Sequence, residues 1–500
     1  MNTIKKNIIA NFLGSIWIAL MNLAFVPLYI HFLGIESYGL VGFFSMLLGI
    51  FSLLDMGLSS TMSFEMARLS AQEGRSQEMK DLARTLEIPY WAIGLLLAFA
   101  VVFLAPWIAS RWVQAKNIAP ETVKLAVILM GLCIGFHWPM NFYSGGLIGL
   151  QQQVLLNAIN ISIATLRGLG SVFILWLISP CIESFFFWQI IISAANTLVN
   201  LVFFWKSLPY TNQKPAFCKA LLKKIGAFAT GMSLASITGI LLFQLQKLIL
   251  SHLLSLETFG YFSLANVCSM SIYRLVMPVF SAASPQMTKL AEKGSIEEIT
   301  KLYHKSTQLV SILVLPVSCV MAFFSKEILI LWTRNPVTAE NTYLLLSILV
   351  LGTAFHSLAH IPWALQLAYG WMRLAIITNF FYILLLSPLM YIFTKWYGAI
   401  GAASIWTIIT IGMLATIPIM HRYLLPGESG RWFLDDVGYP LCSSILVCAI
   451  ARIFISFDWQ AIWLIVSLSL VCITTFFVTA CTANQLNIIE RLKEFLSKIS

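Results

Sequence analysis

The chain has 500 residues, of which 59% are hydrophobic and 10% are charged, and its formal net charge is +10. Soluble domains carry about 25% charged residues, so this composition excludes an ordinary soluble protein and indicates a chain that folds in lipid. Apolar runs recur along the whole sequence. We therefore expect bundles of membrane-spanning helices instead of separate soluble domains.

A helix needs about twenty apolar residues to cross the bilayer. The first apolar run, from Asn7 to Leu33, follows Lys5 and Lys6 and is too long for the core of a signal peptide, so we expect it to be retained as a span. The fold class is therefore all-α and polytopic, with about fourteen transmembrane helices. In chain order, they are predicted near residues 8–32, 38–62, 88–109, 123–147, 155–178, 184–205, 226–250, 258–282, 306–330, 343–366, 374–394, 399–420, 438–456 and 460–482.

One motif occurs twice with a shift of 221 residues. The segment His31–Gly39 (HFLGIESYG) recurs as His252–Gly260 (HLLSLETFG), and Met66–Leu69 recurs as Met287–Leu290. An even number of predicted spans separates the copies, so both have the same orientation in the membrane. This pattern predicts a parallel repeat about an axis along the membrane normal, as in transporters that bind substrate between their repeats.

The repeat divides the chain into two parallel six-helix lobes with a helix pair after them. The predicted N-terminal lobe is followed by a cytoplasmic linker, the C-terminal lobe, the appended pair and an amphipathic tail. The tail lies either on the membrane surface or in solvent. The predicted ranges, in that order, are 1–206, 207–225, 226–421, 438–482 and 483–500.

Basic residues are distributed unequally between the predicted loops. The side that holds Lys5 and Lys6 carries 21 of the 31 Lys and Arg residues, which places both termini in the cytoplasm by the positive-inside rule. The net charge is thus mainly a topology signal, and no nucleic-acid partner is expected. The loop Lys206–Lys224 is basic enough to touch anionic lipid as well.

The sequence contains no recognisable catalytic or cofactor motif. The nine cysteines form no CxxC pair and no cluster at metal-ligand spacing, and there is no Walker loop, HExxH motif or nucleophile elbow. The predicted loops are too short for a soluble catalytic domain. We expect no enzyme activity, no cofactor and no metal site, and we expect the work to be done between the helices.

Arg167 is the most informative charge inside a predicted span, because such a charge normally faces protein or water instead of lipid. On a helical wheel it shares a small and polar face with Asn160, Ala164, Gly170 and Ser171. This face predicts a cationic contact in a central cavity. The alternative is a structural pair with a carboxylate or a carbonyl.

Three other charges within predicted spans are candidates for the site. Asp55 and Arg274 occupy equivalent helices of the two lobes. They either pair as an inner gate or leave Arg274 available to an anion. Lys247 lies near the outer end of its span, where it either snorkels to the interface or lines the cavity with Gln244 on the same helix face.

Three histidines complete the candidate set. His137, His356 and His360 lie in predicted spans, and the last two have the i, i+4 spacing of a metal-binding pair. We favour interior histidines held by hydrogen bonds. With Asp55, these histidines are also the candidates for a gate or for coupling to an ion.

Several loose motifs together resemble the bacterial flippases that move lipid-linked oligosaccharides for O-antigen and polysaccharide synthesis. The resemblance extends from end to end of the chain. It rests on Asn11-Phe-Leu-Gly14, Val26-Pro-Leu-Tyr-Ile30, Gly34-Ile-Glu-Ser-Tyr-Gly39, Leu54-Asp-Met-Gly-Leu58, Gly149-Leu-Gln151, Asn157, Gln246-Lys-Leu-Ile-Leu250, Gly260-Tyr-Phe-Ser-Leu-Ala265 and Gly398-Ala-Ile-Gly-Ala-Ala403.

This resemblance implies the fold of the multidrug, oligosaccharidyl-lipid and polysaccharide exporter superfamily. It implies a substrate that consists of an oligosaccharide on undecaprenyl diphosphate, moved from the cytoplasmic to the outer leaflet of the bacterial inner membrane. The cationic residues would then offset the desolvation of the diphosphate. Further candidate partners are membrane lipid, H+ or Na+ as a coupling ion, and polysaccharide polymerase and chain-length proteins. Many relatives have an acid before the lysine of span seven, where this chain has Gln246, so no charged pair is carried over to that point.

Three other functions compete with this interpretation. A multidrug or cation antiporter of the same superfamily would favour a carboxylate-rich cavity, whereas the four charges singled out inside the predicted spans are three cations and one acid. A peptidoglycan-precursor flippase would have a first-span pattern that is not recognised here. A membrane-embedded glycan polymerase or ligase would need a sizeable outer loop.

Overall fold

The computed structural model describes residues 3–55, 57–219, 221, 238, 241, 243–455 and 461–482. This part of the chain consists of helices and connecting turns, so the predicted all-α fold is confirmed. The chain divides into two compact units, Met1–Gly260 and Tyr261–Ser500. The predicted tail at 483–500 and most of the predicted span at 226–250 lie outside the described residues.

Eleven helices in the described ranges are long and apolar enough to cross a membrane. The chain is therefore a multi-pass membrane protein, as predicted, while the number fourteen remains a prediction. The predicted spans at 8–32 and 374–394 coincide with shorter apolar helices at Ile9–Ala24 and Arg373–Leu385.

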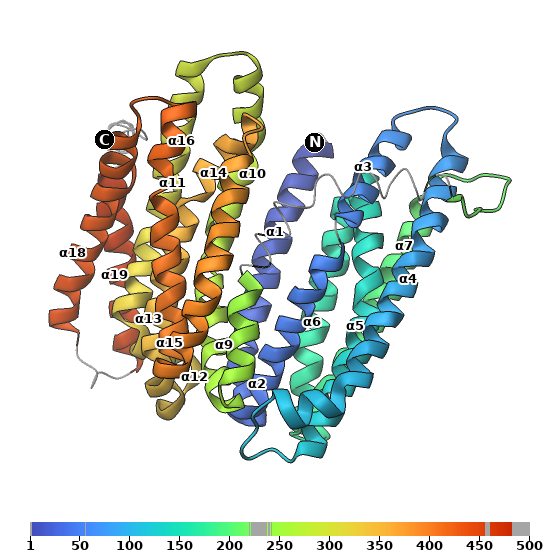
Figure 1. The fold of residues 1–500 in the computed structure, drawn as a ribbon, viewed down its shortest axis with the longest axis horizontal. Helices are drawn as coiled ribbons and strands as arrows, with labels where there is room; N and C mark the ends of the chain where they lie inside the picture. Colours follow the sequence, from blue (N-terminus) through green and yellow to red (C-terminus); the bar gives the residue numbers. More distant parts are fainter. Residues whose placement is uncertain are drawn as a thin grey trace. The chain divides into compact units, whose positions relative to one another are not determined.

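The first unit is a bundle around α5. This helix packs against α3, α4 and α7, and α1 packs against α6 (Figure 1). In order, the elements of the unit are α1 (Thr3–Ala24), α2 (Val26–Ser52), the 3₁₀ turn η1 (Leu53–Asp55), α3 (Leu58–Ser70), α4 (Ser76–Trp107), the π-helical turn η2 (Ile108–Trp112), α5 (Pro120–Gly149), α6 (Gln153–Leu177), α7 (Ile182–Ser207) and helical residues 243–253.

Glycines interrupt the helices where the sequence predicts turns between spans. Gly34 within α2 has φ of +76°, and Gly398 within α15 (Arg373–Leu414) has φ of +60°. Glycine adopts these angles without the steric cost that a side chain would add. The prediction of one continuous helix over 38–62 is wrong, because η1 follows α2 and Gly57 (φ +75°) precedes α3. Hydropathy does not register such a change of backbone direction.

The described part of the predicted linker at 207–225 is held against α4. The backbone N–H of Ala216 donates to Asp81 Oδ1 at 2.7 Å, and that of Cys218 donates to Thr85 Oγ1 at 2.9 Å. Irregular backbone needs such partners because its polar groups have none within a helix. This segment is therefore anchored to the first unit.

The two copies of the repeated motif meet at a pair of glycines. A Cβ placed on Gly39 would lie 2.4 Å from the carbonyl oxygen of Leu256, and one placed on Gly260 would lie 2.3 Å from that of Ile35. Both pairs of equivalent positions, 35 with 256 and 39 with 260, differ by the 221-residue shift. The contact is therefore the same in both directions, as a local two-fold axis between the copies requires.

The connection after η2 joins both copies of the motif. The N–H groups of Lys116 and Asn117 donate to the buried Glu36 carboxylate, at 2.6 and 3.2 Å. The N–H of Leu256 donates to the carbonyl oxygen of Gln114 at 2.8 Å, and the Gln114 amide donates to the carbonyl oxygen of His252 at 2.8 Å. This segment thus holds the two motif copies together.

The second unit is organised around α11, which packs against α10, α13, α18 and α19 (Figure 1). Its elements are α9 (Leu256–Met270, which begins in the first unit), α10 (Tyr273–Glu292), α11 (Ile296–Phe323), α12 (Ser325–Thr333), α13 (Pro336–Leu358), α14 (His360–Ala368), α15, α16 (Ile417–Leu424), α17 (Ser429–Arg431), the π-helical segment η3 (Trp432–Gly438), α18 (Tyr439–Phe454) and α19 (Ala461–Cys481).

The helix pair α18 and α19 docks on α11. Cys319, Phe324, Cys448 and Leu464 belong to one buried apolar cluster that joins the three helices. Lipid is as apolar as these side chains, so close packing and interhelical hydrogen bonds hold such helices together. The hydroxyl groups of Ser444 and Thr479 supply one such bond at 2.8 Å.

Candidate functional site

A cavity of about 380 Å³ lies within the first unit between α1, α2, α5, α6 and α7. Its lining combines aromatic and aliphatic walls with amide, hydroxyl, imidazole and guanidinium groups. The lining residues are Ile18, Met21, Asn22, Phe25, Tyr29, Val41, Phe44, Ser45, Leu48, His137, Asn160, Ile163, Ala164, Arg167, Gly168, Phe185, Gln189 and Asn196.

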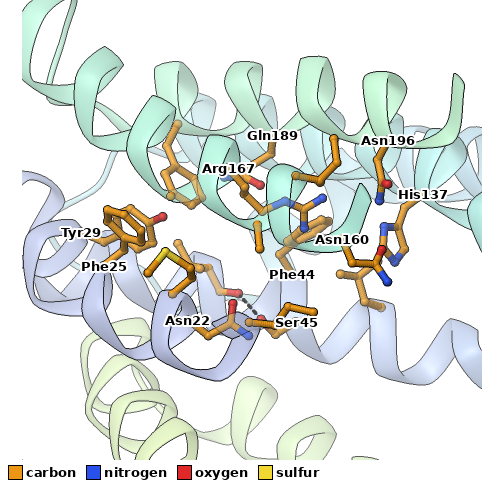
Figure 2. A pocket seen from close by; sticks show the side chains of 18 residues that line it. Asn22, Phe25, Tyr29, Phe44, Ser45, His137, Asn160, Arg167, Gln189 and Asn196 are labelled. Atoms are coloured by element: carbon orange, nitrogen blue, oxygen red, sulfur yellow. Dashed lines mark hydrogen bonds between the residues drawn. The ribbon is translucent and has the colours of Figure 1, made fainter. Parts of the chain in front are cut away.

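Arg167 extends into this cavity from α6. Phe25 and Tyr29 lie together at one end of the cavity, His137, Asn160 and Asn196 lie at the other, and Arg167 lies between them (Figure 2). Its Nε atom is buried and has no hydrogen-bond partner within the described part of the chain. The lining includes no Asp or Glu. Among the residues that the structure describes, the cavity lining thus supplies a cation and no carboxylate to oppose it.

A second layer of hydrogen bonds fixes the backbone around Arg167. The Gln189 amide donates to the Ser171 hydroxyl at 3.0 Å, and this hydroxyl donates to the Arg167 carbonyl oxygen at 2.7 Å. These bonds tie α7 to α6 next to the guanidinium. Its position is therefore set by two packed helices and not by a flexible loop.

This arrangement favours an anionic, partly polar ligand. A buried cation is costly without an opposing charge, and an incoming anion would supply that charge. A guanidinium offers several N–H donors in a planar fork that matches phosphate oxygens. Neighbouring amide groups both donate and accept hydrogen bonds, as the hydroxyl groups of a sugar require.

The structure brings together three of the residues that were singled out from the sequence. Arg167, Asn160 and His137 line the same cavity, and Ala164 lies between the first two on α6. Gly170, which shares their face on the helical wheel, does not line it. A Cβ on Gly170 would instead lie 2.1 Å from the ring of Trp188.

Asp55 is placed in η1 and does not line the cavity. Its carboxylate accepts hydrogen bonds from Tyr90 Oη at 2.6 Å and from the hydroxyl of Ser59 at 2.6 Å. The Ser59 N–H also donates to it at 3.3 Å. These contacts link the break between α2 and α3 to α4.

Gln244 and Lys247 lie on the helical residues 243–253 and are also outside the cavity lining. Gln244 packs against α2, where a Cβ on Gly49 would lie 2.2 Å from its side-chain nitrogen. Lys247 is half-buried. Their role at the substrate site therefore stays a prediction.

Arg274, His356 and His360 belong to the second unit, where Arg274 is exposed. The hydroxyl of Tyr273 and Nδ1 of His356 are 3.0 Å apart, and Nδ1 of His360 lies 3.1 Å from the His356 carbonyl oxygen. Within the described ranges, no group of three His, Cys, Asp or Glu side chains has a metal-binding arrangement. Hydrogen bonding accounts for these histidine positions.

Several cavity residues were not identified from the sequence. Asn22, Gln189 and Asn196 are amides in otherwise apolar helices, and Ser45 lies on α2. A search for uncharged amides within predicted spans would have identified the three amides. It would not have shown which helix faces meet.

The fold and the cavity define a multi-pass helical membrane protein with a polar cavity inside its first helical unit. The structure is similar to a lipid II flippase, MurJ, in an inward closed conformation. The TM-score is 0.71 and the identity 16%, with 94% of this chain and 97% of that chain covered. It is also similar to an inward-facing multidrug resistance transporter of the MATE family and MOP superfamily. For that protein the TM-score is 0.63 and the identity 14%, with 81% and 96% of the two chains covered.

The sequence comparisons identify the family. Residues 4–291 match the family described as polysaccharide biosynthesis protein, and the chain belongs to this family. It is also 20% identical over 412 residues to an O-antigen transporter candidate from Shigella flexneri, with 81% of this chain and 94% of that protein covered. The resemblance to polysaccharide flippases that was noted in the sequence is confirmed.

Proposed function

We propose that the protein flips an oligosaccharide linked to undecaprenyl diphosphate, the repeat unit of O-antigen or of another surface polysaccharide. The proposed movement is from the cytoplasmic to the outer leaflet of the bacterial inner membrane, by alternating access, with both termini in the cytoplasm. Membership of the polysaccharide biosynthesis family and the transporter fold support this proposal. They also favour transport over glycan polymerisation or ligation.

The observation that carries the proposal is Arg167, whose buried Nε lies in a cavity where the described lining residues include no carboxylate. A diphosphate must lose much of its hydration to enter such a cavity, and a cation held ready there offsets that cost. A transporter of cationic drugs would gain nothing from this charge. The groups beside Arg167 also suit the sugars that follow the diphosphate. Aromatic side chains pack against sugar rings, and amide groups form hydrogen bonds with sugar hydroxyl groups.

Arg167→Ala tests the proposal in cells that lack the native gene. We expect surface glycan to fall about tenfold or more at equal protein level, because the anion would enter the cavity without a counter-charge. Lipid-linked precursor should accumulate on the inner side. Arg167→Lys should retain part of the activity, because the charge remains while the planar fork is lost.

Arg111→Ala is the control, because Arg111 is exposed and lies outside the cavity. Full glycan display by R167A would remove Arg167 from the proposed role. Display of single repeat units on the surface, without internal precursor, would instead indicate loss of a polymerase.

A further inference from the structure

A buried cluster in the second unit combines a histidine with two carboxylates. His304 on α11 is 0% exposed, with Nδ1 2.5 Å from Asp436 Oδ2 and Nε2 2.9 Å from Glu428 Oε2. Asp436 lies on η3 and is also 0% exposed, and Glu428 immediately precedes α17. None of these residues belongs to the cavity described above.

The geometry fixes how many protons the cluster holds. Each of the two N···O contacts needs one proton between its atoms, and a neutral imidazole brings only one N–H. Without a second proton, a nitrogen lone pair would face a carboxylate oxygen at close range away from water. The second proton therefore resides either on the imidazole, which becomes imidazolium, or on one of the carboxyl groups.

The surrounding groups are consistent with one added proton. With it, the three residues together carry one negative charge, and Arg431 NH1 lies 3.7 Å from Glu428 Oε2. Gln308 donates from Nε2 to Asp436 Oδ1 at 3.0 Å. The nearby His421 lies 2.9 Å from Tyr303 Oη and 3.2 Å from Ser429 Oγ, and it is close enough to interact electrostatically with His304 and Glu428.

The cluster also reaches the surface of the second unit. The Glu428 side chain is 28% exposed, while His304 and Asp436 are fully buried, so the chain of contacts leads from the surface inward. Its members come from elements far apart in sequence, α11 and the segment between α16 and α18. Binding or loss of the proton therefore acts on the attachment of that segment to α11.

We propose that His304, Asp436 and Glu428 form an exchangeable proton-binding site that fastens the segment Glu428–Gly438 to α11. With the proton bound, both imidazole nitrogens bridge to carboxylates and the segment is held. When the proton leaves, a carboxylate oxygen faces a lone pair, and the attachment of the segment weakens. This inference is independent of the proposed substrate and of Arg167.

Spectroscopy of the purified full-length protein tests the proton count. The chain has seven histidines, so the ring nitrogens of His304 are assigned by nitrogen-15 NMR as the signals absent from His304→Gln. At neutral pH we expect one of two results. Either both ring nitrogens of His304 are protonated, or one is protonated and an infrared band of a protonated carboxyl group is present. In the second case, Asp436→Asn or Glu428→Gln should remove that band. A singly protonated ring without such a band would overturn the proposal.

The pH dependence of stability tests exchange. A proton that the folded state binds more tightly than the unfolded state stabilises the fold, and this contribution is lost as the pH rises through its release from the folded state. We therefore expect the melting temperature of wild type to exceed that of H304Q by an amount that shrinks with rising pH. Glu428→Gln changes a partly exposed side chain and should show the same trend. This variant replaces H304Q in the test if H304Q folds poorly.

His356→Gln is the control, because it removes a histidine of the same unit that contacts Tyr273 instead of the cluster. Its effect should not follow the pH dependence of H304Q. A wild-type advantage over both H304Q and E428Q that stays constant with pH would overturn the proposed exchange.

Discussion

Gly39 and Gly260 occupy equivalent positions in two copies of one motif, and each lies against the backbone of the other copy. The carbonyl oxygens that they approach, those of Leu256 and Ile35, are themselves equivalent under the 221-residue shift. The internal repeat is thus expressed as a local two-fold contact, and a side chain at either glycine would separate the copies.

Gly39→Ala and Gly260→Ala should therefore destabilise the protein in the same way. Each adds a methyl group where the nearest oxygen is 2.4 or 2.3 Å away, and overpacking of this kind costs about 1–3 kcal/mol. We expect each variant to lower the melting temperature of the purified protein. The double variant should lower it by less than the sum, because both changes disturb one contact.

Gly430→Ala provides the comparison for these variants, since no other atom in the described ranges crowds a Cβ at that position to within 4 Å. Strict additivity of G39A and G260A, or losses no larger than that of G430A, would contradict the close approach.

An internal counter-ion should abolish the function of the cavity. Ala164 lines the cavity one turn before Arg167, so Ala164→Asp places a carboxylate at the i, i+3 spacing that allows pairing. We expect glycan display to fall by about tenfold or more relative to Ala164→Asn, since the paired guanidinium no longer needs an external anion. Asp and Asn have nearly the same volume, so equal display by the two variants would show that charge does not matter here.

Arg452 and Glu327 should contribute unequally to stability. Arg452 on α18 forms an ion pair with Glu327 on α12, and the exposed fractions of the two side chains are 41% and 1%. Arg452→Gln leaves a buried carboxylate alone, which costs up to about 3–5 kcal/mol when the charge cannot reach water. Glu327→Gln leaves an arginine that can reach solvent. Thermal unfolding should rank R452Q as the less stable variant, and the reverse order would contradict this account.

Sequence patterns predicted the features that depend on local hydropathy or on a single unusual residue. Arg167 was identified because a charge within an apolar span is costly, and Gly34 and Gly398 lie where breaks between apolar runs were predicted. The break at η1 was missed. Apolar residues flank it on both sides, and a left-handed Gly57 changes the direction of the chain without changing its hydropathy.

Contacts between distant segments could not be predicted in this way. Asn22 and Asn196 reach the same cavity only because α1, α6 and α7 pack together. His304 and Asp436 are 132 positions apart, and the sequence placed Asp436 in a connecting loop. A single sequence shows which face of each helix is polar or apolar. It does not show which other helix packs against that face.

Binding of undecaprenyl diphosphate to the purified protein tests the central claim most directly, with uncharged undecaprenol as the comparison lipid. The account predicts that wild type prefers the diphosphate lipid and that R167A binds the two lipids equally, because Arg167 is the only Arg or Lys among the described residues that line the cavity. An undiminished preference for the diphosphate in R167A, at the same content of folded protein, would contradict it.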